Sequence, residues 1–166
     1  MTDYNWHSIG FQDRSKYIEE KSLTSRFYIL NDVYKGECTK FKRLNSGSEE
    51  GFDHSKYTIP MIECADKIIE MLESRLRFCY KELKQNEMLD WRKYEEVELN
   101  IKQNLSHWYC TRAATKLRTD LLQGTNLDFK KDLILSIRYD PDNERAHRLW
   151  ACSGEDLPPE AYKPLL

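Results

Sequence analysis

The 166-residue sequence contains little glycine and proline and almost no valine. Six glycines and five prolines occur in the whole chain, and valine stands only at positions 33 and 97. Glycine and proline mark turns and valine favours strands, so their scarcity disfavours a fold built of strands and turns. We therefore expect an all-α protein: a single-domain bundle of four to five helices over residues 1–166, with a short C-terminal tail.

Long apolar runs are absent as well. No stretch approaches the roughly 18 apolar residues that a membrane-spanning helix needs, and the first ten residues lack the basic and apolar regions of a signal peptide. The five cysteines are odd in number and scattered along the chain, which disfavours a disulfide framework. We expect a cytoplasmic protein with reduced cysteines and no membrane partner.

Sequence motifs of the common catalytic sites are missing. The chain has no Gly-x-Ser-x-Gly, no phosphate-binding glycine loop and no His-Glu-x-x-His. These absences favour a protein that is not an enzyme and needs no cofactor. They do not address a Cys–His or His–His site assembled in space from His54, His107 or His147.

The first third of the chain predicts one long helix after an irregular segment, residues 1–13. Apolar residues recur at helical spacing from Leu23 to Phe41, and Thr24 is a suitable N-cap. These signals predict a helix over residues 24–43, with a short helical piece around 15–22.

A glycine- and serine-rich segment, residues 45–58, has no apolar period and predicts an exposed loop. Pro60 fits the first position of the next helix, because its missing N–H is not needed there. The apolar stripe that follows predicts a helix to about Gln85.

The segment 90–124 carries two apolar stripes that lie on nearly opposite sides of one helix. The upstream stripe runs from Trp91 to Trp108, and the downstream stripe comprises Cys110, Ala114, Leu117 and Leu121. Either the helix breaks near Asn104, or one continuous helix is buried on two sides. Because the region contains no proline or glycine before Gly124, we favour the continuous helix.

The C-terminal region contains one ambiguous segment. Residues 127–139 fit either a strand or a helix, and helix is favoured because a lone strand would have no partner. A last helix is expected over 143–152, followed by a tail over 154–166.

Basic residues are unevenly distributed, with six basic and two acidic side chains over residues 101–131. A basic helical face can bind the phosphates of a nucleic acid, and an aromatic residue on it can stack on a base. The nucleic-acid-binding hypothesis therefore uses Lys102, Tyr109, Arg112, Lys116, Lys130 and Lys131. The alternative is a solvated face that pairs with the acidic segment 82–98.

Two short motifs suggest a metal-dependent enzyme as another alternative. Glu144 and His147 are one helical turn apart, and His107 and Cys110 have the same spacing. The chain has no second Glu-x-x-His, and the spacings typical of zinc sites are missing.

The leading hypothesis is a protein that binds another protein, as an adaptor, regulator or inhibitor. Ten tyrosines and four tryptophans are types that interfaces favour. The candidate contacts are Tyr4, Trp6, Tyr57, Trp91 and Tyr162. A homodimer is an alternative, formed through the apolar line Cys64, Met71 and Phe78.

Overall fold

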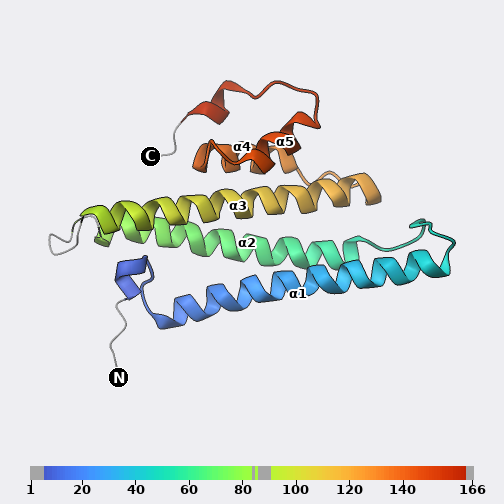
Figure 1. Cartoon of the computed structure of the whole chain (residues 1–166), viewed down its shortest axis with the longest axis horizontal. Coiled ribbons are helices and arrows are strands. Elements are labelled where there is room, and N and C mark those ends of the chain that lie inside the picture. The colour runs from blue at the N-terminus through green and yellow to red at the C-terminus, as the bar shows by residue number, and fades with distance from the viewer. Residues whose placement is uncertain (1–5, 84, 86–90, 164–166) are drawn as a thin grey trace.

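A computed structural model describes residues 6–83, 85 and 91–163, and all regular structure within them is helical. Three long helices, α1 (Arg14–Leu44), α2 (Ser55–Phe78) and α3 (Trp91–Gln123), lie side by side in Figure 1. The short helices α4 (Phe129–Tyr139) and α5 (Glu144–Ala151) cover the side of α3 that faces away from α1. The all-α prediction is confirmed. None of the described helices combines the length and apolar character needed to cross a membrane.

Helix α1 begins at Arg14, so the predicted start at Thr24 was wrong. Asp13 caps the helix, because its carboxylate accepts a hydrogen bond from the backbone N–H of Lys16 at 3.0 Å. The Thr24 hydroxyl instead donates to the backbone carbonyl of Glu20 at 2.9 Å. A side chain that finds its acceptor inside the helix does not mark the helix end.

Helix α2 begins at Ser55, which corrects both the predicted loop 45–58 and the predicted start at Pro60. The loop therefore covers residues 45–54, and its last residue, His54, is only 2% exposed. Thr58 is also buried and accepts a hydrogen bond from the hydroxyl of Thr119 at 2.8 Å. Sequence polarity indicated exposure here, but these polar side chains have buried partners. At its other end α2 passes into a π-helical turn, Cys79–Leu83.

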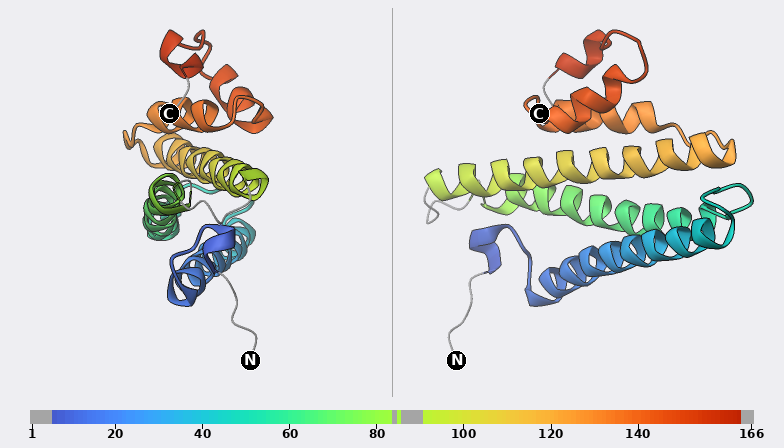
Figure 2. Two further views of the ribbon diagram at one scale, coloured as in Figure 1. Left: turned by 90° about the vertical axis from the view of Figure 1, so that its left-hand side faces the viewer. Right: turned by 45° about the vertical axis from the view of Figure 1, so that its right-hand side comes forward.

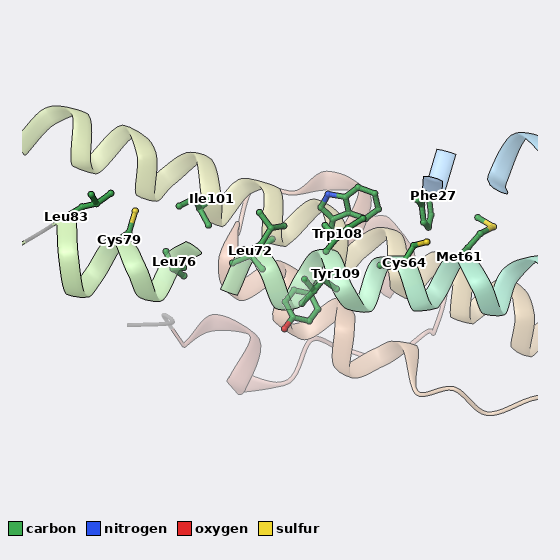
Figure 3. Packing of buried hydrophobic residues seen from close by; sticks show 14 of the residues in the cluster. Phe27, Met61, Cys64, Leu72, Leu76, Cys79, Leu83, Ile101, Trp108 and Tyr109 are labelled. Atoms are coloured by element: carbon green, nitrogen blue, oxygen red, sulfur yellow. The ribbon is translucent and has the colours of Figure 1, made fainter. Parts of the chain in front are cut away.

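Helix α3 is continuous, as predicted, and separates two hydrophobic cores. In the first core, Trp108 of α3 meets Phe27 of α1 edge to face, with ring centroids 5.1 Å apart. Figure 3 shows this layer of side chains between α2 and α3. In the second core, Cys110 and Ala113 pack with residues of α4 and α5. One helix is therefore buried on two sides in its middle.

Two buried serines join α3 to α4. The Ser106 hydroxyl donates to the backbone carbonyl of Ser136 at 2.8 Å, and the Ser136 hydroxyl donates to that of Ser106 at 2.7 Å. These small side chains satisfy their own polar groups at the helix contact. The prediction of helix for residues 127–139 is confirmed by α4.

The last predicted helix is also confirmed, and Asn143 caps α5 by accepting from the backbone N–H of Ala146 at 3.1 Å. The described part of the predicted tail is not free of structure. It contains a 3-10 turn, Pro159–Tyr162, from which Ala161 packs into the second core. The Trp150 indole N–H also donates to the carbonyl of Glu155 at 3.0 Å.

Candidate functional site

The predicted basic surface is largely occupied by acidic partners from the same chain. Lys102 lies 2.9 Å from Glu98, and Lys130 lies 2.8 Å from Glu155. The Tyr109 hydroxyl donates to Glu73. Lys131 is exposed on α4.

Arg112 connects three helices instead of facing solvent. Its guanidinium binds both oxygens of Asp132 on α4, at 2.9 and 2.7 Å, and an oxygen of Asp66 on α2 at 2.8 Å. Lys116 lies 2.9 Å from the same Asp132, whose side chain is 4% exposed. Two of the predicted phosphate-binding cations thus balance one buried carboxylate, which holds the helices together.

The four residues of the metal-enzyme alternative have separate surroundings. His107 Nε2 lies 3.3 Å from the Tyr28 hydroxyl, while His147 Nε2 lies 2.8 Å from the carbonyl of Pro141. Cys110 is buried in the second core, and Glu144 is exposed at the start of α5. These four residues are not among the convergent ligand groups found in the described part of the chain.

The five predicted protein contacts are spread over the molecule. Tyr4 and the side chain of Trp91 lie outside the described residues. Trp6 packs on Tyr17 with ring centroids 4.9 Å apart, Tyr57 stacks on neighbouring aromatic rings, and Tyr162 is exposed. The homodimer alternative used the apolar line Cys64, Met71 and Phe78. Cys64 belongs to the first core, and Phe78 packs against that core. Met71 is half-buried.

The downstream stripe of α3 is covered only in part. Helix α4 lies against the middle of α3, whereas the C-terminal end of α3 extends beyond α4 in Figure 1. A surface hollow of about 290 Å³ lies on this end, lined by Ala114, Leu117, Arg118, Leu121 and Leu122. Leu121 is 76% exposed there. We call this surface the open α3 surface.

A second feature, the Cys38 cluster, lies where α1, the loop 45–54 and α2 meet. Ligand atoms of Cys38, Glu49 and His54 all lie within 4.8 Å of one another. The Cys38 thiol donates to Glu49 Oε1 at 3.6 Å, and His54 Nε2 is 3.6 Å from Glu49 Oε2. Cys38 and His54 are buried, while Glu49 is partly exposed and also pairs with Lys42 at 2.7 Å.

Aromatic rings enclose the buried side of the Cys38 cluster. The Tyr34 hydroxyl lies 2.7 Å from His54 Nδ1. The Phe52 ring contacts the His54 ring with centroids 4.9 Å apart, and Tyr57 stacks on Tyr34 at 5.6 Å. The imidazole is therefore held in one orientation by a hydrogen bond and by packing.

Burial and neighbouring charges shift the pKa values of this cluster. Burial raises the pKa of the Cys38 thiol, and the adjacent Glu49 carboxylate raises it further. Burial also lowers the pKa of His54, although Glu49 opposes this shift. The hydrogen bond from Lys42 lowers the pKa of Glu49. At neutral pH the cluster thus holds a thiol, a neutral imidazole and a carboxylate.

Sequence reasoning missed this cluster, apart from naming His54 among the histidines of a Cys–His or His–His site assembled in space. The missing information is the path of the loop. Gly47 and Gly51 adopt φ values of +84° and +86°, which L-residues rarely take, and they let the chain turn back toward α1. The two glycines between Cys38 and His54 were the sequence signal that the loop turns back toward α1.

A different polar cluster, the Glu20–Arg75 pair, lies near the N-terminal end of α1. Arg75 Nη1 donates to Glu20 Oε1 at 2.9 Å, Nη2 donates to the carbonyl of Ile9 at 3.0 Å, and the guanidinium lies 3.7 Å from the centroid of the Phe11 ring. Glu20 Oε2 and Arg75 Nε have no hydrogen-bond partner among the described residues. Burial accordingly raises the pKa of Glu20 and lowers that of Arg75, shifts that their mutual attraction opposes.

Comparison of the chain with protein-family models, with curated proteins and with solved structures finds no match.

Proposed function

We propose that this chain binds another protein through the open α3 surface. The observation that supports the proposal is the exposed end of an apolar stripe whose first part is buried. Cys110 of that stripe packs in the second core, whereas Leu121, three helical turns further on, is 76% exposed. Contiguous exposed apolar surface is typical of interaction sites, while single exposed leucines are not.

The spacing of the surface suggests the kind of partner. Ala114, Leu117 and Leu121 recur at the intervals of one helical face. A partner helix can lay an apolar face into such a hollow, and an acidic residue beside that face would meet Arg118. The protein would then act as an adaptor, regulator or inhibitor in the cytosol, a location supported by five free cysteines.

The other functions have less support. The nucleic-acid alternative requires cations that already pair with carboxylates of the chain, as Arg112 and Lys116 do with Asp132. The metal-enzyme alternative requires His107, Cys110, Glu144 and His147 to meet, and these residues have separate surroundings. A homodimer through the open α3 surface is an outcome of the test below.

The test compares three baits in cells that naturally make the chain: the wild type, Leu121→Glu and the matched control Leu99→Glu. Leu99 lies on the same helix, is 57% exposed and does not line the hollow. We expect wild type and Leu99→Glu to retain one protein in a fixed ratio, and Leu121→Glu to lose it. With the purified pair, Leu121→Glu should weaken binding about 100-fold, since a leucine that the partner would bury is replaced by a charge.

Recovery of the same protein by all three baits, or of no protein by any, would contradict the proposal. Circular dichroism of each variant checks that the helices remain folded. Sedimentation of the wild-type chain at two concentrations distinguishes self-association from binding to a different protein.

A further inference from the structure

We propose that Cys38, Glu49 and His54 form a binding site for one zinc-class divalent cation. The three side chains come from the end of α1, the loop 45–54 and the residue that precedes α2. Their ligand atoms converge within 4.8 Å. The proposal concerns ion binding alone and does not rest on the proposed function, although Arg118 of the open α3 surface lies over the Tyr34 ring, 4.8 Å from its centroid.

The donor set fits zinc. Thiolate sulfur, imidazole nitrogen and carboxylate oxygen are the three ligand types that Zn²⁺ takes in proteins. Calcium and magnesium prefer oxygen ligands throughout, so Cys38 and His54 argue against them. A thiolate and a carboxylate supply two negative charges, which balance the charge of a divalent ion in a largely buried place.

The spacing of the ligand atoms is close to that of tetrahedral coordination. Bonds of about 2.0–2.3 Å to a central ion place neighbouring ligand atoms about 3.3–3.8 Å apart in a tetrahedron. The Cys38 Sγ–Glu49 Oε1 and His54 Nε2–Glu49 Oε2 distances are both 3.6 Å, to the two oxygens of one carboxylate. One ligand atom from each residue lies within 4.8 Å of the other two, so the side chains must draw slightly closer to surround an ion. The three side chains supply three positions and leave the fourth for water on the partly exposed side of Glu49.

Tyr34 supplies the outer contact that a metal-binding histidine usually has. When His54 binds an ion through Nε2, its Nδ1–H can donate to the Tyr34 hydroxyl oxygen, which lies 2.7 Å away. The same contact orients the ring, and Phe52 packs against it. The imidazole therefore needs little reorientation to accept the ion.

Lys42 is the group that must move. Its ammonium lies 2.7 Å from Glu49 Oε1, and its side chain is 45% exposed. It can therefore withdraw into water while the cation takes its place beside the carboxylate. Binding also releases the Cys38 thiol proton to solvent, because the thiolate is the ligand.

The experiment uses the full chain, reduced and freed of metal with a chelator. Zinc is titrated in competition with a chromophoric chelator, and cobalt replaces zinc to report the ligands. We expect one ion per chain, a rise in unfolding temperature, and the charge-transfer absorption of a cobalt–thiolate bond. Cys38→Ser should abolish this absorption and weaken zinc binding at least about 100-fold, whereas the matched control Cys152→Ser should keep both.

Two further variants keep the test decisive if Cys38→Ser does not fold. Glu49→Gln, at a partly exposed position, should weaken zinc binding at least tenfold, and Tyr34→Phe should weaken it about tenfold through the loss of the outer contact. Failure of the wild-type chain to compete for zinc would overturn the proposal. Binding that Cys38→Ser and Glu49→Gln leave unchanged, or that Cys152→Ser removes, would overturn it as well.

Discussion

The two ends of the contact between α1 and α2 carry buried polar clusters of different character. The Glu20–Arg75 pair joins an anion to a cation, so its charges compensate within the chain. The Cys38 cluster brings together three groups that can each donate an electron pair. Lys42, which pairs with Glu49, is on the exposed side, and Arg118 lies over the Tyr34 ring. The charges of the first cluster are balanced without an added ion, whereas the second cluster is suited to receive one.

The largest expected effect comes from breaking the compensated pair. Glu20→Ala leaves the Arg75 guanidinium, whose side chain is 10% exposed, without its carboxylate. We expect the free energy of unfolding in urea to fall by about 3 kcal/mol. The control Glu19→Ala removes an exposed carboxylate on the same helix turn and should change it by less than about 0.5 kcal/mol. Equal effects of the two variants would contradict this account.

A smaller effect on stability is expected at the Cys38 cluster, where Tyr34 contacts the buried His54. Tyr34→Phe leaves the buried His54 Nδ1 without its hydroxyl partner, so we expect a loss of about 1–2 kcal/mol in the free energy of unfolding. Tyr28 is the matched control, because its hydroxyl lies 3.3 Å from His107 at an exposed position. Tyr28→Phe should cost less than about 0.5 kcal/mol. Similar losses would mean that burial of the histidine does not matter.

The smallest expected effect is a dependence of the free energy of unfolding on pH, which arises from Glu20. Burial raises the pKa of Glu20 against the opposing attraction of Arg75, so the folded chain holds this proton more tightly than the unfolded chain. The part of the stability that comes from proton binding at Glu20 is therefore fully present below the ordinary glutamate pKa and is lost as pH rises through the folded value, whereas the pairing with Arg75 remains.

The measurement for this effect is urea unfolding of wild type and Glu20→Gln at several values between about pH 4 and pH 7. The free energy of wild type minus that of the variant should decline as pH rises. A difference that increases with pH would contradict the raised pKa. Glu19→Gln, compared in the same way, controls for the general loss of one carboxylate.

The sequence predicted the helices better than it predicted their ends. The continuous α3 followed from two apolar stripes with no proline or glycine between them, and local spacing carries that information. The start of α1 was missed because Thr24 is a strong capping residue whose hydroxyl instead bonds to Glu20 in the preceding turn. Local patterns do not distinguish these two uses of a threonine.

The candidate sites depended on contacts that are distant in sequence. Arg112 looked free because its partners, Asp66 and Asp132, belong to other helices. The Cys38 cluster required the return of the loop through Gly47 and Gly51, which no periodicity encodes. The open α3 surface is the reverse case, since Leu121 had the pattern of a buried residue and is exposed.

The position of α3 between two cores has a consequence for synthesis on the ribosome. Both α1 and α2 leave the ribosome before α3, and the core that contains Phe27 and Leu72 lacks its α3 residues, such as Leu105 and Trp108, until α3 follows. The second core also needs α3, because Leu133 and Ile137 pack against Cys110 and Ala113. Neither core can therefore be completed during translation until residues near 113 have emerged, and the surfaces of α1 and α2 that α3 covers stay exposed until then.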